Sequence, residues 1–303
     1  MGILKKIKKN KYVTRIRRYS AYLVCVVCLQ IVRRFSWRTM VNLGRGLGRF
    51  GFHRVKYSRK RTLDNLTNVF GDEKTEAEII AIAERVYENM GVTALEFPRL
   101  PWMTDSEFFE VVDYDEADLV LLRELLEEGM GSIYAGAHMG NWEMLADFGA
   151  RIGLTMSVLY KPSTNPYINK LWIEMRGRNK LIDINENLAQ VTKRLKENES
   201  VCLLFDENAR SRGVKVPFFG RPASTYQGPA YFALRTGAPI VCVYFIRDND
   251  FRHRFIIERV IRPVRKGKLE EDIIDILMEL NESLEKMIRR YPDQWNWVYK
   301  RWS

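Results

Sequence analysis

Residues 131–147 of this 303-residue chain, GSIYAGAHMGNWEMLAD, constrain its fold more than any other stretch. Residues 131–137 are small or apolar, which is typical of a short buried strand. From Glu143 onward the apolar residues follow helical spacing, and Asn141 fits the N-cap position of that helix. The sequence therefore predicts a strand, a turn relaxed by Gly140 and a helix, which is the repeating unit of α/β folds.

The predicted turn brings together two residues with acid–base chemistry. His138 leaves the strand, and Glu143 opens the helix five residues later. A His held by a carboxylate is the usual construction of a general base, because the acid fixes the tautomer and stabilises the imidazolium. A His that only hydrogen-bonds a helix start is the plainer alternative, and one short motif does not decide between them.

The rest of the chain predicts an α/β fold with a mostly parallel central sheet flanked by helices on both faces, because strand and helix patterns alternate. The predicted strands are 131–137, 154–160, 181–184, 200–206, 239–246 and 253–260, with helices at 143–152, 165–178, 187–197 and 226–236 between them. Sites in such sheets lie beyond the carboxyl ends of strands, where His138 and Asp206 are placed.

Helices are also predicted at 76–97, 116–129 and 269–290. Thr75 and Glu78 have the spacing of a capping box at the start of the first of these helices. The acidic residues 106–116 are predicted to be extended.

The positive charge of the chain is confined to its N-terminal segment. Residues 1–62 contain eighteen Lys or Arg and no acidic residue, whereas the remainder has 31 basic and 38 acidic residues. Such a segment suits a polyanion, either a nucleic acid or an anionic membrane surface. We predict a basic N-terminal segment, 1–62, attached to one compact α/β domain, 63–303.

An uncharged run, residues 19–32, lies inside this basic segment between two groups of arginines, which are Arg15, Arg17 and Arg18 before it and Arg33, Arg34 and Arg38 after it. Arms that bind nucleic acid do not carry such a run, so no nucleic-acid partner is expected. The run is shorter than the roughly 20 residues that span a bilayer core. We predict a membrane-associated helix in the cytoplasmic leaflet, with a buried helix or a short span as alternatives.

The cysteines and histidines do not indicate a metal site. Cys25 and Cys28 lack the second pair of ligands of a zinc motif, and Cys202 and Cys242 lie in predicted buried strands, so all four are expected to be reduced. His53, His138 and His253 are too scattered for a catalytic zinc. The glycine-rich residues 44–51 lack the strand and the Gly-Lys-Ser/Thr of a phosphate loop, and they favour close packing of a helix on its neighbour or on lipid.

Three further clusters have two open interpretations each. Arg176 and Arg178 end a predicted helix, where they complement its dipole or clamp a phosphate or carboxylate. Residues 206–225 form a long loop with a basic trio, and loops of this length tend to be functional. Its Phe218 and Phe219 belong to the core or to the wall of an acyl groove. The Trp residues of 291–302 are expected to pack, or to lie at a membrane interface.

Three motifs together resemble the bacterial lipid A biosynthesis acyltransferases, the lauroyl/myristoyl group of the lysophospholipid acyltransferase superfamily. They are HMGNWE at 138–143, VPFFGRPAST at 216–225 followed by GPA at 228–230, and PDQWNWVYKRW at 292–302. The resemblance spans nearly the whole chain, including the N-terminal helix.

The resemblance implies an enzyme that transfers a fatty acyl chain from an acyl carrier protein or coenzyme A thioester to a hydroxyl of a lipid A precursor. It implies work at the cytoplasmic face of the bacterial inner membrane, with membrane lipid as a partner. Relatives acylate phosphatidylinositol mannosides, so another glycolipid or a lysophospholipid is the alternative acceptor. The thioester is a co-substrate, no cofactor is expected, and no covalent acyl-enzyme is expected because no Ser or Cys lies within motif reach of His138.

The resemblance also assigns site residues. His138 and Glu143 match the catalytic pair, and Arg176 matches a position near the site. Asp206 matches an Asp that the family usually follows with Gln, where this chain has Glu207. The expected substrate-binding residues are Asn141, Arg176, Arg178, Asp206, Phe218, Phe219, Gly220 and Thr225, and the expected rim for the donor or headgroup is the basic trio Arg210, Arg212 and Lys215.

Overall fold

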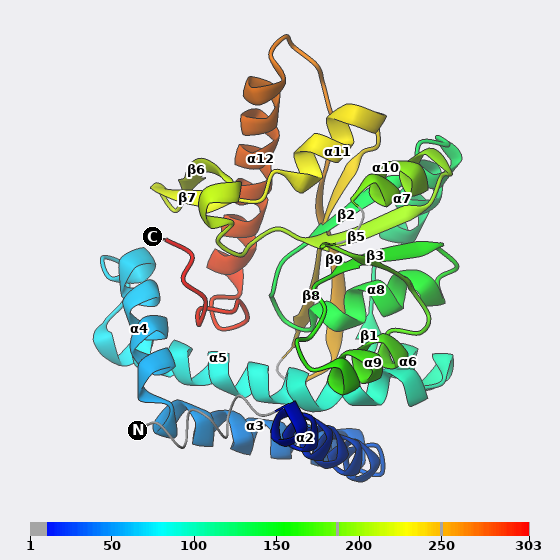
Figure 1. Ribbon diagram of the computed structural model, residues 1–303. Coiled ribbons are helices and arrows are strands. Elements are labelled where there is room, and N and C mark those ends of the chain that lie inside the picture. Colours follow the sequence, from blue (N-terminus) through cyan, green and yellow to red (C-terminus); the bar gives the residue numbers. More distant parts are fainter. Residues whose placement is uncertain (1–10, 186–187, 249–250, 303) are drawn as a thin grey trace.

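The computed structural model describes residues 11–185, 188–248 and 251–302, and its centre is a seven-stranded sheet in the order β1-β9-β8-β2-β5-β3-β4 (Figure 1). Every neighbouring pair is parallel except β8 and β9, which are antiparallel. The predicted mostly parallel sheet is therefore confirmed. Its strands are β1 (Val112–Asp113), β2 (Ser132–Gly136), β3 (Met156–Tyr160), β4 (Lys180–Asp183), β5 (Ser200–Leu204), β8 (Ile240–Arg247) and β9 (His253–Ile261).

Helices cover both faces of the sheet because successive strand residues enter different cores. On β2, Tyr134 packs with α8, whereas Ile133 and Ala135 belong to the opposite core with α10, α11 and α12. The first core is completed by α6 and α7. These helices are α6 (Asp105–Glu110), α7 (Glu116–Glu127), α8 (Trp142–Arg151), α10 (Ala189–Lys196), α11 (Gly228–Thr236) and α12 (Leu269–Arg290).

The N-terminal third is helical and extends along one end of the sheet (Figure 1). It contains α2 (Lys11–Val32), α3 (Trp37–Arg54), α4 (Lys56–Phe70), α5 (Glu76–Glu96) and the 3-10 helix η1 (Phe97–Trp102). The capping box of Thr75 and Glu78 at the start of α5 is confirmed. Among the described residues, no helix combines the length and the apolarity needed to cross a bilayer.

Glycines let α3 lie directly on α5, as the glycine-rich pattern predicted. A Cβ added at Gly48 would lie 2.1 Å from the carbonyl oxygen of Tyr87, and one at Gly44 would lie 2.6 Å from the Cα of Val92. From the other helix, a Cβ at Gly91 would lie 2.2 Å from the Gly44 carbonyl oxygen. The two backbones therefore touch where side chains would otherwise separate them.

Two of the predicted segments differ from the structure. Residues 106–116 were expected to be extended, but residues 106–110 belong to α6, which begins with a capping box of Thr104 and Glu107 and is followed by the short β1. The second half of the predicted loop 206–225 is an antiparallel hairpin of β6 (Val214–Phe218) and β7 (Arg221–Thr225), after the 3-10 turn η2 (Arg210–Arg212). The hairpin packs on α12, so alternate residues are buried rather than solvated.

The four cysteines of the described chain are free. Cys202 and Cys242 are buried in β5 and β8 as predicted, whereas on α2 Cys25 is half-buried and Cys28 is exposed rather than packed. Burial raises the pKa of the Cys202 and Cys242 thiols to about 12, so neither is a thiolate at neutral pH.

The contact between α3 and α5 predicts opposite effects for two neighbouring glycines. Gly48→Ala should lower the free energy of unfolding by about 1–3 kcal/mol, because its methyl group overlaps the Tyr87 backbone. Gly46 has no atom within 4 Å of an added Cβ, so Gly46→Ala should raise that free energy by about 0.5–1 kcal/mol through helix propensity. Chemical denaturation of both variants measures the difference, and equal effects would contradict this packing.

Candidate active site

The site begins where two adjacent parallel strands end. Gly136 on β2 pairs with Leu204 on β5, and the chain continues two residues further to His138 and Asp206 respectively. Because the register is aligned, the two side chains meet: His138 Nδ1 lies 2.9 Å from Asp206 Oδ1. The backbone amide of His138 also donates to Asp206 Oδ2 over 3.0 Å. The prediction that both residues lie at the carboxyl edge of the sheet is confirmed.

Asp206 is almost completely buried and is held from several directions. Besides His138, the indole Nε1 of Trp295 donates to Asp206 Oδ2 over 2.9 Å. Burial alone would raise the pKa of Asp206, but His138 and the indole lower it below its ordinary value. Asp206 is therefore an anion that accepts three hydrogen bonds, two of them from His138. The substrate-binding role expected of it stays a prediction.

The state of His138 follows from this partner. Burial by itself lowers the pKa of His138, but the Asp206 carboxylate outweighs it, so the pKa is raised above 6.5. A carboxylate only accepts, so the neutral ring carries its proton on Nδ1 and leaves Nε2 as the basic atom. Nε2 lies 3.9 Å from Glu207 Oε1, and the rings of Trp142 and Tyr299 each lie 5.1 Å from the imidazole.

Glu143 pairs with Arg176 instead of orienting His138. Arg176 follows α9 (Pro166–Met175), and its Nε donates to Glu143 Oε2 over 2.9 Å while its Nη2 donates to Oε1 over 2.5 Å. A guanidinium offers a carboxylate two parallel charge-assisted bonds, whereas an imidazole offers one. Glu143 was expected to contact the His138 ring, but in the described chain the hydrogen-bond partner of the ring is Asp206.

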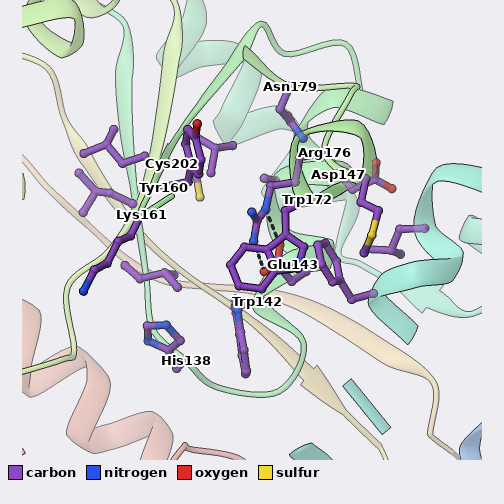
Figure 2. A pocket seen from close by; sticks show the side chains of 18 residues that line it. His138, Trp142, Glu143, Asp147, Tyr160, Lys161, Trp172, Arg176, Asn179 and Cys202 are labelled. Atoms are coloured by element: carbon purple, nitrogen blue, oxygen red, sulfur yellow. Dashed lines mark hydrogen bonds and ion pairs between the residues drawn. The ribbon is translucent and has the colours of Figure 1, made fainter. Parts of the chain in front are cut away.

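A pocket of about 170 Å³, lined by both polar and apolar side chains, opens beside these residues (Figure 2). Its polar groups come from His138, Glu143, Asp147, Tyr160, Lys161, Arg176 and Asn179. Figure 2 shows the ion pair of Glu143 and Arg176 beside the ring of Trp172. Its apolar wall comes from η1, α8, the ends of β3 and β5, and α9, including Phe97, Leu100, Ala146, Val158, Leu159, Met175, Cys202 and Leu203. A cavity with an apolar wall can hold a hydrocarbon chain, and the reactive group of that chain can then lie near His138.

Several of the expected substrate-binding residues lie outside this pocket. Asn141 is buried, and its carbonyl oxygen caps α8 by accepting from the amides of Glu143 and Met144. The prediction that Asn141 is the N-cap is therefore confirmed. The side-chain NH₂ group of Asn141 donates to Glu96 and not into the pocket. Arg178 is also absent from the pocket lining, and it pairs with Asp147 over 3.5 Å and with Asp105 over 3.8 Å.

The motif residues of the hairpin lie in the core or in the hairpin turn. Phe218 is buried and stacks on Trp302, so its core alternative is the one the structure has. Thr225 is buried and accepts from Arg301, while Phe219 and Gly220 form the hairpin turn with positive φ. The basic trio Arg210, Arg212 and Lys215 is exposed, as predicted, on η2 and β6.

The C-terminal segment contributes more than the packing that was expected of its tryptophans. Trp295 holds Asp206, and the amide of Asn296 donates to the carbonyl oxygen of His138 over 2.9 Å. Trp295 and Trp297 are completely buried, which excludes a membrane-interface role for these two rings. The sequence indicated Asp206 because it follows a predicted buried strand. No sequence pattern indicated the contact of Trp295 with Asp206, because the two residues are far apart in the chain.

Comparison with known proteins gives a consistent assignment. Residues 6–303 match the family described as bacterial lipid A biosynthesis acyltransferase. The chain is 25% identical to a lipid A biosynthesis lauroyltransferase of Escherichia coli, over 94% of this chain and 92% of that protein. It is 25% identical to a lipid A biosynthesis palmitoleoyltransferase of Escherichia coli, covering 86% and 84% of the two chains.

A relative with another acceptor in its name is equally similar. A phosphatidylinositol mannoside acyltransferase of Mycolicibacterium smegmatis is 24% identical, over 78% of this chain and 77% of that protein. These matches agree with the strand-turn-helix motif, the parallel sheet and the His-bearing pocket. The chain therefore belongs to the bacterial lipid A biosynthesis acyltransferase family and is an acyltransferase.

Proposed function

We propose that this enzyme transfers a fatty acyl chain from the thioester of acyl carrier protein or coenzyme A to a hydroxyl of a lipid A precursor. The observation that carries the proposal is the His138–Asp206 pair, in which Asp206 is buried and His138 lines the pocket. The proposed reaction uses no metal or cofactor, because a positioned base and an activated thioester are sufficient for it.

The proposed mechanism begins with the acceptor hydroxyl. Its oxygen attacks the thioester carbonyl carbon while its proton moves to Nε2 of His138, and Asp206 stabilises the imidazolium. The carbonyl electron pair moves onto the oxygen, whose negative charge the guanidinium of Arg176 stabilises from the pocket wall. Collapse re-forms the carbonyl and breaks the C–S bond. The leaving sulfur takes the proton from His138, so the products are an ester and a free thiol.

The acceptor is proposed at the level of a glycolipid with a free hydroxyl. Lipid A acyltransferases and phosphatidylinositol mannoside acyltransferases are similar to this chain to nearly the same extent, so a mannosylated lipid is the second candidate. We assign the exposed trio Arg210, Arg212 and Lys215 to capture of an acidic donor protein or a phosphorylated headgroup at the rim. Mass spectrometry of products from purified enzyme, with a panel of donors and acceptors, identifies the pair.

Removal of the base should abolish most turnover. His138→Ala should lower kcat by about 10²–10⁴, the usual contribution of a positioned base, while the protein keeps its fold. Product formation measured with the best donor and acceptor, together with circular dichroism of the variant, tests this expectation. A folded variant with near-normal kcat would show that His138 is not the base.

The partner of the base should be visible in the pH dependence. His138 must be neutral to accept a proton, so the rate should fall as the pH drops through its raised pKa. Asp206→Asn removes the main cause of that raised pKa, and burial then lowers it. The acidic limb of the profile should therefore move to lower pH, and the plateau should fall by about 10²–10⁴.

Glu143→Gln is the matched comparison, because Glu143 acts on the pKa of His138 only from a distance. The acidic limb should then move less than in Asp206→Asn, although turnover falls. A profile that moves with Glu143→Gln and stays in place with Asp206→Asn would reverse the assignment of the partner.

We propose that α2 holds the enzyme at the cytoplasmic face of the inner membrane. Val24 and Val27 lie one turn apart on α2 and are 62% and 57% exposed, within the uncharged run between arginines. Tyr19 and Tyr22 of α2 pack on Tyr167 of α9, the helix that contributes Trp172 and Met175 to the pocket wall. An apolar helix face in the interface would therefore bring the lipid acceptor close to the site.

Substitution of this face should weaken binding to vesicles of phosphatidylethanolamine and phosphatidylglycerol. Val24→Glu with Val27→Glu should lower the partition coefficient at least about tenfold, since each apolar side chain contributes roughly 1.5–3 kcal/mol when buried in lipid. The control is Val120→Glu with Val264→Glu, at two similarly exposed valines away from α2. Equal sedimentation of both double variants with vesicles would contradict anchoring by α2.

A further inference from the structure

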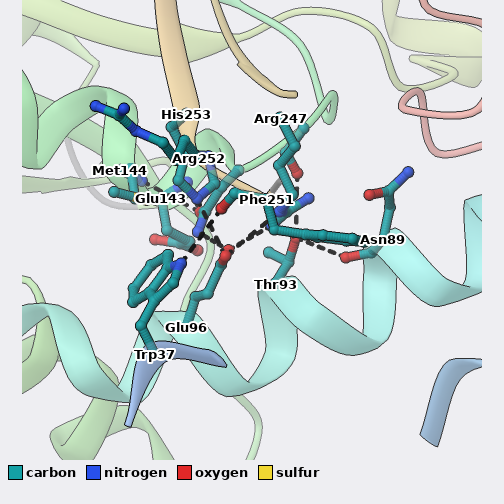
Figure 3. Close-up of polar contacts among 12 residues, drawn as sticks. Trp37, Asn89, Thr93, Glu96, Glu143, Met144, Arg247, Phe251, Arg252 and His253 are labelled. Atoms are coloured by element: carbon teal, nitrogen blue, oxygen red, sulfur yellow. Dashed lines mark hydrogen bonds and ion pairs between the residues drawn. The ribbon is translucent and has the colours of Figure 1, made fainter. Parts of the chain in front are cut away.

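A cluster of charged and polar side chains lies buried between α5, the ends of β8 and β9, and the turn that carries the proposed base (Figure 3). Its centre is Glu96, the last residue of α5, which is completely buried. Arg247 pairs with Glu96 through Nη2, and His253 Nε2 lies 3.0 Å from Glu96 Oε1. None of these three residues lines the pocket, so the proposed mechanism does not use them directly.

The charge of Glu96 is secure in this environment. Burial alone would raise the pKa of Glu96, but Arg247 and His253 lower it to about 2. Burial lowers the pKa of His253, so at neutral pH the imidazole is neutral and donates from Nε2. At neutral pH the cluster therefore consists of one carboxylate, one guanidinium and one neutral ring. Glu96, which accepts the hydrogen bonds, is an anion.

Glu96 reaches the proposed active site through Asn141. Asn141 Nδ2 donates to Glu96 Oε2 over 2.7 Å, and Asn141 Oδ1 accepts from the amides of Glu143 at 3.2 Å and Met144 at 3.3 Å. A carboxylate can only accept, so it obliges the Asn141 amide to point its NH₂ group toward Glu96. The carbonyl oxygen is thereby directed at the first turn of α8.

The backbone of the same turn is clamped by the residues around the cluster. Thr93, one helical turn before Glu96, accepts from Arg247 Nη2 over 2.6 Å, and its single hydroxyl proton is shared between the carbonyl oxygens of Gly140 at 3.1 Å and Asn89 at 3.0 Å. The Gly140 amide donates to Gln294, and the Asn141 amide donates to Phe245. Gly140 has φ +58°, and an added Cβ would lie 1.8 Å from the Phe245 carbonyl oxygen, so no other residue fits.

The first turn of α8 carries groups that face the base. The Trp142 ring lies 5.1 Å from the His138 ring, and Glu143 holds Arg176 in the pocket wall. A displacement of this turn would therefore move Trp142 and the Glu143–Arg176 pair relative to His138. Misplacement by about 1 Å can cost on the order of 10²-fold in rate.

We propose that Glu96 is a positioning residue for acyl transfer, and that it acts through Asn141 to fix the first turn of α8, and with it Glu143, relative to His138. The inference rests on the proposed function for its reaction, but its structural content does not depend on the identity of the donor or the acceptor. Glu96 touches no substrate, so its loss should lower kcat and leave the Michaelis constant for the donor nearly unchanged.

The chain offers a matched control on the same helix. Glu88 lies two turns before Glu96 on α5, is also buried, and also pairs with arginines, namely Arg45 and Arg49 of α3. Its contacts join α3 to α5 and do not reach the turn of residues 139–141. Glu88→Gln and Glu96→Gln both replace a buried carboxylate by an amide, and they differ in the element that the carboxylate holds.

The test compares Glu88→Gln, Glu96→Gln, Asn141→Asp and the double variant Glu96→Gln/Asn141→Asp in the full-length chain. Glu96→Gln should lower kcat by about tenfold to a hundredfold, with the donor Michaelis constant changed less than about threefold. Asn141→Asp sets two carboxylates against each other and should lower kcat by about a hundredfold. The double variant keeps one carboxylate near Arg247 and restores the hydrogen bond with its direction reversed, so it should recover about tenfold over Asn141→Asp. Glu88→Gln should keep the kcat of the parent, even when its melting temperature falls as far as that of Glu96→Gln.

Amide hydrogen exchange gives a readout that is independent of activity. Peptides covering residues 139–146 should exchange faster than in the parent in both Glu96→Gln and Asn141→Asp. They should exchange more slowly in the double variant than in Asn141→Asp. In Glu88→Gln they should exchange at the rate of the parent. Parent-like exchange of the Glu96→Gln variant, equal losses of kcat for Glu88→Gln and Glu96→Gln, or a double variant no better than Asn141→Asp would each overturn the inference. If Glu96→Gln does not fold, the comparison of the Asn141→Asp and double variants decides. A parent enzyme without acyl transfer but with the expected exchange pattern would refute the proposed function and support the positioning role.

Discussion

The hydrogen bond between His138 Nδ1 and Asp206 Oδ1 is the contact on which the proposed acyl transfer depends. It exists because β2 and β5 are adjacent, parallel and in register, so that residues two positions past each strand end arrive at the same place. In a parallel sheet, side chains that follow neighbouring strands often come into contact, because the carboxyl ends of the strands lie at the same edge. The C-terminal segment completes it by donating from Trp295 to the second oxygen of Asp206.

Three buried or half-buried carboxylates surround this point, and each has its own cationic or proton-donating partner. Asp206 pairs with His138, Glu143 with Arg176, and Glu96 with Arg247. A buried carboxylate without such a partner would be protonated or would destabilise the fold. Because the partners differ, the three carboxylates act on different parts of the site. In the proposed mechanism, Asp206 acts on His138, Glu143 on Arg176 in the pocket wall, and Glu96 on the turn that joins His138 to α8.

The N-terminal helices are continuous with this arrangement. The glycines of α3 let it lie on α5, and α5 ends at Glu96, which contacts the turn before α8. Trp37 at the start of α3 donates to the Phe251 carbonyl oxygen and lies edge-on to His253. Although the division into residues 1–62 and 63–303 stays a prediction, the basic segment and the α/β body share one packed interface near the site.

The sequence by itself determined most of the helices and strands and the position of His138 and Asp206 at the edge of the sheet. Local patterns were sufficient for the strand, turn and helix of 131–147, for the alternation that makes a parallel sheet, and for the placement of His138 and Asp206 at its edge. These properties depend on residues close together in the chain, where periodicity and capping leave a visible trace. The predicted helices 76–97 and 269–290 agree with α5 and α12 for the same reason.

Only the tertiary structure decided which partner each charged group has. Glu143 is five residues from His138 and was expected to hold it, yet Asp206, 68 residues away, does so. The hairpin of β6 and β7 was predicted to be an exposed loop. Its buried residues are covered by α12, which lies far along the chain, so the local pattern did not indicate their burial. The network of Glu96, Arg247 and Asn141 likewise joins three distant segments. Pairing across such distances depends on strand register and helix packing, and neither is written in the local pattern of residues.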